Sequence, residues 1–264
     1  SMPAFNMTAP ASVYRERRHR FASKLHRPMV VFSGHAPARN YPANAHVFRA
    51  QSTYVYFGGA PVEDAALLIE PGSDGDAGCS LFRQPWTSDD EVWMGPGATD
   101  ADLATAGGLS VLRVLDRATL AAKLAGRTAG MIASADLPTR EWGAALGLSA
   151  ASADELLAVI DLRLCKDQHE LEAMRRAAKV NVEAQLAVAK ACRRGGTEAQ
   201  AAAAFFEVLV RHQQQPSFTP IITVRGEVLH SNGYPGRLRD GSLLLSDAGS
   251  EEPGGYACDV TRVY

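Results

Sequence analysis

Two aspartates near the end of the chain have a spacing that suggests chemistry. Asp247 follows an apolar run at residues 243–245, and Asp259 lies inside a second apolar run at residues 256–260. The stretch between them, residues 250–255 (SEEPGG), predicts a turn, so the two runs are expected to be strands of an antiparallel hairpin. Ionised carboxylates are costly to bury unless they are paired or bind a metal. Two of them on adjacent strands predict a divalent metal site, with hard oxygen ligands suited to Mn or Mg.

A structural role is the alternative for the same two residues. Aspartate is common at turns that follow strands, and the sequence Asp247-Ala248-Gly249 suits such a turn. Asp259 has a candidate ion-pair partner in Arg262. The residue pattern alone leaves the metal and the structural interpretations open.

Two helices, followed by a strand at residues 216–224, are expected before the hairpin. Asp167 with Glu170, and Thr197 with Gln200, have the spacing of capping boxes. The first helix carries a stripe at helical spacing that is predicted to face the core: Leu171, Met174, Ala178, Val182, Leu186 and Ala189. The second is predicted to pack through Phe205, Phe206, Leu209 and Val210.

The first half of the chain predicts an α/β domain. Residues 14–25 read as an amphipathic helix whose basic residues form a solvated face. Strands are expected at residues 28–34, 65–70 and 79–82, and helical stretches alternate with short β segments over residues 100–150. The aromatic residues 48–59 read as a buried strand or packed segment, and the acidic residues 89–91 as a solvated loop.

The composition is that of an ordinary soluble globular protein. The chain has 264 residues, 46% of them hydrophobic and 21% charged, and this length favours two domains. A net charge of −2 gives no reason to expect nucleic acid as a partner. Four widely spaced cysteines without a CxxC motif favour a reduced, cytoplasmic setting. No apolar run approaches twenty residues, so no membrane span is expected.

The hairpin resembles the metal-binding hairpin of the pita-bread metallopeptidases, the family that includes aminopeptidase P and prolidase. That hairpin has the form D-x-G followed by G-Y-x-x-D-[IV]-T-R, and Asp247-Ala248-Gly249 and residues 255–262 (GYACDVTR) match it. The turn is one residue longer here than is usual in the family. Two segments of the first half are also similar to aminopeptidase P: residues 48–59 (FRAQSTYVYFGG) and residues 91–95 (EVWMG).

The resemblance covers residues 14–264 and implies an α/β fold with two parts. Residues 4–158 correspond to an N-terminal α/β domain of the creatinase and RNase H-like type. Residues 159–264 correspond to the first part of a pita-bread α+β catalytic domain. The family uses a histidine and two glutamates further along its chain, so these 264 residues by themselves are expected to be inactive.

The resemblance also implies an activity and a set of site residues. A metal-dependent exopeptidase of this family releases the N-terminal residue from peptides with proline at the second position, through a hydroxide that bridges two divalent ions. Mn is expected, with Co or Zn as alternatives. Asp247 would hold one ion, Asp259 would bridge both, and His230 would act as a catalytic residue that contacts the substrate, although its loop is shorter than the family's.

Trp93 is a candidate for the substrate pocket, because the matching family tryptophan reaches the active site of a neighbouring subunit. A core or interface aromatic is the alternative role for Trp93. The family's habit implies a homodimer or homotetramer.

Three other functions remain open at this point. A prolidase would share these residues and prefer dipeptides. A creatinase-like hydrolase has the same fold without metals, and the presence of both Asp247 and Asp259 argues against it. A non-catalytic pita-bread module would bind peptides, but such modules typically lose the metal carboxylates.

Overall fold

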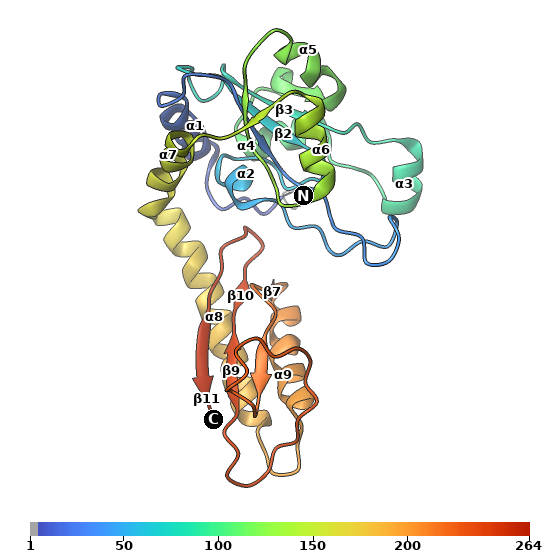
Figure 1. Ribbon diagram of the computed structural model, residues 1–264, viewed down its shortest axis with the longest axis vertical. Coiled ribbons are helices and arrows are strands. Elements are labelled where there is room, and N and C mark those ends of the chain that lie inside the picture. The colour runs from blue at the N-terminus through green and yellow to red at the C-terminus, as the bar shows by residue number, and fades with distance from the viewer. Residues whose placement is uncertain (1–4) are drawn as a thin grey trace. The chain divides into compact units, whose positions relative to one another are not determined.

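The computed structural model describes residues 5–264 and divides the chain into two compact units, one ending at Cys165 and one beginning at Lys166 (Figure 1). The sequence places this boundary after residue 158. Helix α7 (Ala153–Leu164) runs through that point, and its Ala158, Val159 and Leu162 are buried in the core of the first unit. Residue 4, where the predicted first domain begins, lies outside the described residues.

The first unit is built on a mixed six-stranded sheet. The strand order is β4-β3-β2-β1-β5-β6, and the central β1 pairs antiparallel with β2 and parallel with β5. The predicted strands are present in the structure. The six strands are β1 Met29–Phe32, β2 Ala66–Ile69, β3 Cys79–Arg83, β4 Val114–Asp116, β5 Gly130–Ile132 and β6 Ser149–Ala150.

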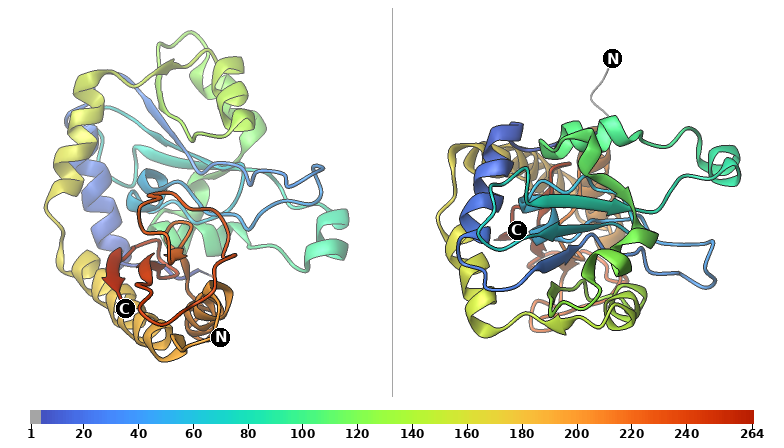
Figure 2. Two further views of the ribbon diagram at one scale, coloured as in Figure 1. Left: turned by 60° about the horizontal axis from the view of Figure 1, so that its bottom comes forward. Right: turned by 90° about the horizontal axis from the view of Figure 1, so that it is seen from above.

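Helices cover both faces of this sheet, which makes the unit a layered α/β domain as predicted (Figure 2). Alternate residues of β1 enter different hydrophobic clusters: Met29 and Val31 on one side, Val30 and Phe32 on the other. The first cluster includes residues of α1 (Ala11–Ala22), α2 (Ser52–Tyr56), α4 (Asp100–Gly107) and α7; the second includes residues of α5 (Leu120–Leu124) and α6 (Leu137–Ala145).

Two predicted segments of the first unit contain helices. Residues 48–59 include the short helix α2, so of the two alternatives the strand is wrong and the buried, packed segment is correct. The acidic residues 89–91 lie in helix α3 (Ser88–Met94), not in a loop. Thr87 and Asp90 form a capping box at its start, and carboxylates in a first turn interact favourably with the positive end of a helix. Local charge therefore supports a helix at this position.

The basic face of α1 is only partly solvated, which corrects the prediction for this helix. Arg17 and Arg18 are buried. The guanidinium of Arg18 donates to the backbone oxygens of Gly75 (2.6 Å), Phe57 (2.8 Å) and Gly107 (2.8 Å). Burial lowers the pKa of Arg18. The acceptors lie at the C-terminal ends of α2 and α4 and in the loop before β3. The charge is therefore hydrogen-bonded within the protein, and it ties α1 to these three segments.

The second unit packs two helices against strands. Helix α8 (Gln168–Ala191) starts at the Asp167–Glu170 capping box and α9 (Glu198–Arg211) at the Thr197–Gln200 box, as predicted. The main sheet has the order β11-β9-β8, and the short strands β7 and β10 form a separate pair. Their bounds are β7 Gln215–Pro216, β8 Ile221–Thr223, β9 Leu245–Ala248, β10 Ser250–Glu251 and β11 Val260–Val263. In neither unit, over residues 5–264, is a helix long and apolar enough to cross a membrane.

The buried face of α8 differs from the predicted one. Several members of the apolar stripe are exposed: Leu171, Met174, Val182 and Leu186. The buried side combines small and polar residues with two valines: Glu170, Ala173, Ala177, Val180, Asn181, Ala184, Gln185 and Val188. Polar contacts cause this reversal: Ser250 Oγ donates to the Ala177 oxygen (2.8 Å), and the Tyr256 hydroxyl donates to Glu170 (2.8 Å). In α9, Phe205 and Leu209 are buried as predicted, but Val210 is exposed.

Substitutions on the two sides of α8 test this assignment. Ala177→Leu adds volume to a fully buried site and is expected to lower the free energy of unfolding by about 1–3 kcal/mol. Val182→Gln, on the predicted but exposed stripe, is expected to change it by no more than about 0.5 kcal/mol. Denaturant unfolding measures both. A larger loss for Val182→Gln than for Ala177→Leu would contradict the observed orientation.

An ion pair anchors the start of α7 in the first unit. Arg27 Nε and Nη2 donate to the two oxygens of Glu155 at 2.7 and 2.8 Å. Glu155 also completes the α7 capping box with Ser152. The hydrogen bonds from Arg27 hold the pKa of Glu155 at about 2, below its ordinary value of 4.5.

Glu155→Gln is therefore expected to lower stability in a pH-dependent way. A depressed folded-state pKa stabilises the fold above pH 4.5, and this contribution is lost as the pH falls toward 2. The difference between Glu155→Gln and wild type in denaturant unfolding should be largest at neutral pH and should shrink over that window. Asp154→Asn, which removes a charge from the same helical turn, is the control. A difference independent of pH would contradict the ion-pair contribution.

Candidate metal centre

The predicted hairpin forms, with one register along its whole length. Asp247 lies opposite Thr261 and Ala248 opposite Val260 in the β9–β11 ladder. The same register continues through the Glu251–Ala257 bridge. It closes with a hydrogen bond from the Glu252 nitrogen to the Tyr256 oxygen (2.9 Å). The turn therefore spans residues 253–255, and the positive φ of 87° at Gly255 favours glycine there.

The register places both aspartates on one face of the sheet. Thr261 Oγ1 donates to Asp247 Oδ1 at 2.7 Å, so these opposite side chains point the same way. Asp259 precedes Thr261 by two residues and belongs to the same face, because side chains alternate along a strand. Diagonal neighbours of this kind lie within reach of each other. Asp247 is half-buried and Asp259 is exposed.

This geometry fits two oxygen ligands of a divalent ion better than the structural alternatives. Asp247 lies inside β9, so it is not the turn residue that the alternative requires. Arg262 directs Nη1 to the Thr261 oxygen (2.7 Å), and among residues 5–264 it forms no ion pair with Asp259. Among residues 5–264, no three or more His, Cys, Asp or Glu side chains lie together in a way that could hold a metal. The two aspartates can therefore supply only part of a metal site.

The opposite face of the hairpin rests on α8. Gln185 Nε2 donates to the backbone oxygens of Val260 (2.9 Å) and Ser246 (3.4 Å). The Tyr264 hydroxyl donates to Gln185 Oε1 (3.1 Å) and to its backbone oxygen (3.0 Å). Burial raises the pKa of Tyr264. Gln185 was not identified as a site residue from the sequence. The only sequence feature that could have pointed to it is an amide side chain in the middle of a long helix.

His230 lies in the exposed segment between β8 and β9. No hydrogen bond or ion pair joins it to Asp247 or Asp259 in the described part of the chain. Buried Glu198 ties the two ends of this segment together, accepting from the Val224 nitrogen (2.7 Å) and the Gly236 nitrogen (2.7 Å). A Cβ at Gly236 would lie 2.3 Å from the Glu198 carboxylate, so the approach requires glycine.

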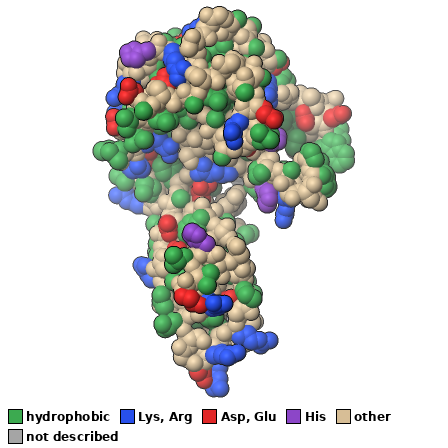
Figure 3. All heavy atoms as spheres, in the orientation of Figure 1, with side chains coloured by type: hydrophobic (Ala, Val, Ile, Leu, Met, Phe, Trp, Pro, Cys, Tyr) green, Lys and Arg blue, Asp and Glu red, His purple; other side chains and the backbone are tan. Residues whose placement is uncertain are grey.

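Trp93 is on helix α3 of the first unit and is 85% exposed, so it is not a core residue. Its neighbours Val92 and Met94 are exposed as well, and Figure 3 shows apolar side chains gathered over this helix. Trp86 Nε1 donates to the Gly95 oxygen (3.1 Å) just after the helix ends. The structure thus presents Trp93 at the surface of its unit.

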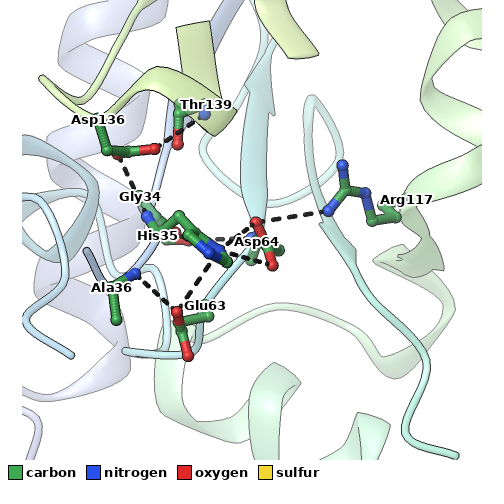
Figure 4. A network of polar contacts seen from close by, with 10 residues as sticks. Gly34, His35, Ala36, Glu63, Asp64, Arg117, Asp136 and Thr139 are labelled. Atoms are coloured by element: carbon green, nitrogen blue, oxygen red, sulfur yellow. Dashed lines mark hydrogen bonds and ion pairs between the residues drawn. The ribbon is translucent and has the colours of Figure 1, made fainter. Parts of the chain in front are cut away.

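A second group of charged side chains, which the sequence does not predict, lies in the first unit (Figure 4). His35 Nδ1 is 3.2 Å from both oxygens of Asp64 and 3.6 Å from Glu63 Oε1. The His35 nitrogen donates to Asp136 (3.2 Å), and Arg117 Nη1 is 3.6 Å from Asp64. These contacts join loops that are distant in the sequence, so their role in this structure is to hold the loops after β1 and before β2 and α6 together.

The chain matches two domain families, one in each of its two units. Residues 14–138 match the aminopeptidase P N-terminal domain, and residues 172–264 match metallopeptidase family M24. The chain therefore belongs to the M24 metallopeptidases that carry an aminopeptidase P N-terminal domain.

Relatives and solved structures agree with this assignment. Xaa-Pro aminopeptidase 2 of Streptomyces coelicolor is 32% identical over 254 residues, and Xaa-Pro aminopeptidase of Escherichia coli is 25% identical over 270 residues. These alignments cover 89% and 95% of this chain but only 52% and 61% of the relatives. The fold is similar to aminopeptidase PepP of Pseudomonas aeruginosa (TM-score 0.82, 23% identity, 98% of this chain and 62% of that one). Aminopeptidase P of E. coli with the inhibitor Pro-Leu is similar too (TM-score 0.81, 22% identity, 97% and 62%).

Glu198→Gln tests the anchor of the His230 segment. The new amide would direct N–H groups at a backbone N–H donor, so we expect a loss of about 1–3 kcal/mol in the free energy of unfolding. Hydrogen–deuterium exchange over residues 225–235 should become faster. Glu207→Gln, at an exposed position of α9, is the control. Equal stability and exchange in the two variants would show that Glu198 does not anchor the segment.

Proposed function

We propose that the intact protein is a metal-dependent aminopeptidase that removes the N-terminal residue from peptides with proline at the second position. The placement of Asp247 and Asp259 on one face of the β9–β11 hairpin carries this proposal. Membership of the M24 metallopeptidases and similarity to Xaa-Pro aminopeptidases support it.

The complete site requires more ligands than the pair described above. The chain spans about half the length of its first relative, and two carboxylates alone are few ligands for a divalent ion. We infer that a histidine and two glutamates outside these 264 residues complete a site for two divalent ions, with Mn expected and Co or Zn as alternatives. By themselves, the 264 residues are expected to be inactive.

Divalent ions held at this site would activate water near neutral pH and polarise the scissile carbonyl. Asp247 would contact one ion and Asp259 both. The Thr261 hydroxyl occupies Asp247 Oδ1 as a hydrogen-bond donor, which restricts the rotation of that carboxylate. His230 would contact the substrate from the segment anchored by Glu198.

Trp93 would contribute to the substrate pocket of a neighbouring subunit in a homodimer or homotetramer. Its high exposure on a helix with two further exposed apolar residues supports this role, since exposed apolar groups of this kind mark interaction sites.

We also propose a cytoplasmic location for the protein, because its four cysteines are free thiols.

The test uses the intact natural protein loaded with Mn(II) and a peptide series. We expect cleavage of Xaa-Pro-Xaa tripeptides and longer peptides, and none when alanine replaces proline. Asp247→Asn and Asp259→Asn should each weaken metal binding by more than about 100-fold. That loss exceeds the one typical when a residue that only supports a metal ligand is replaced. His230→Ala should keep the metal and lose turnover.

Each outcome separates the alternatives. A preference for Xaa-Pro dipeptides would favour a prolidase. Peptide binding without cleavage or metal would favour a non-catalytic module. Metal-loaded protein that cleaves no Xaa-Pro peptide would refute the peptidase.

A further inference from the structure

We propose that Gln185 is a positioning residue for the Asp247–Asp259 pair and holds both strands that carry the carboxylates from the opposite face of the sheet. The proposal rests on the proposed function of this pair as metal ligands. Gln185 would thus contribute to metal binding from the middle of α8. It lies on the face of the sheet opposite the two carboxylates and would not touch the ion.

The contacts of Gln185 fall next to the two aspartates. Its Nε2 donates to the oxygen of Ser246, the residue before Asp247, and to the oxygen of Val260, the residue after Asp259. Neighbouring residues of a strand point to opposite faces. Hydrogen bonds that fix the backbone at these two positions therefore also fix the directions of the two carboxylates on the other face.

The orientation of the Gln185 amide follows from its surroundings. The oxygens of Ser246 and Val260 can only accept, so the atom that faces them is the amide nitrogen, and Oε1 faces the Tyr264 hydroxyl (3.1 Å). The reversed amide would place Oε1 against the carbonyl oxygens of Ser246 and Val260, so that three acceptors would face one another with no donor between them. Gln185 is buried, so water does not replace these contacts.

An amide suits this position better than other side chains. It offers two N–H groups, one for each strand, and adds no charge beneath two carboxylates. A glutamate would lack the donors and add a third negative charge. An apolar side chain would leave buried carbonyl oxygens without this second partner.

The support should matter for affinity as well as for stability. Two carboxylates on adjacent strands repel each other until a cation binds, and this repulsion favours spreading of the strands. A residue that ties both strands to one helix keeps the ligands in place before the ion arrives, which lowers the cost of ordering them on binding. Loss of Gln185 should therefore weaken metal binding more than an equal loss of stability elsewhere in the hairpin.

Calorimetric titration of the intact natural protein with Mn(II) tests this, together with denaturant unfolding of the metal-free protein. Gln185→Met keeps the length and removes the donors. The matched control is Tyr256→Phe, which removes a 2.8 Å contact between the same hairpin and the same helix at Glu170. We expect Gln185→Met to weaken Mn(II) affinity by about 10- to 100-fold, and Tyr256→Phe to change it by less than about twofold.

The outcomes separate this proposal from the proposed function. Wild-type protein that binds no Mn(II) would overturn both. Wild-type binding with equal affinity in Gln185→Met, or an equal loss in the two variants, would overturn the role of Gln185 alone. If Gln185→Met does not fold, Tyr264→Phe frees Gln185 Oε1 and keeps the donors. That variant should bind Mn(II) more weakly than Tyr256→Phe, and equal affinities would overturn the proposal.

Discussion

Two like charges on one face of the β9–β11 ladder repel each other, and the second unit is arranged to keep them in register. Asp247 lies opposite Thr261, and Asp259 follows the same alternation. A slip of one residue would turn a carboxylate toward α8 and away from its partner, because the side-chain period of a strand is two residues. The unbroken register down to the 253–255 turn and the contacts with α8 prevent that slip.

The polarity of α8 is a consequence of this arrangement. Strands that must be held in place need hydrogen-bond partners on their supporting face, and α8 provides them through Glu170, Gln185 and the backbone oxygen of Ala177. The small residues between them let the hairpin approach closely. Leu171, Met174 and Leu186 lie on the other side of the helix, while Val180 and Val188 join the core of the unit. In the first unit Arg18 follows the same principle, since it is buried and donates to backbone oxygens at the ends of helices α2 and α4.

Contacts between residues close in the sequence could be predicted from the sequence alone. The capping boxes that start at Asp167 and Thr197 are formed within three residues, and both helices begin there. The hairpin was predictable because the turn signal lies between two apolar runs, and its carboxylates could be placed on adjacent strands for the same reason. The family resemblance agrees with the matches to both domain models. These features depend on spacing and on turn chemistry, which the sequence contains directly.

Only the tertiary structure decided which sides of the elements are buried. The apolar stripe of α8 predicted the wrong face because Ser250, which bonds to Ala177, is 73 residues away in the sequence. The burial of Arg18 depends on acceptors such as Gly107, 89 residues further on. Gln185 and Glu198 could not be identified beforehand for the same reason. Hydrophobic periodicity records which side chains avoid water, but hydrogen bonds between distant segments determine which polar groups can be buried, and those partners meet only in the folded chain.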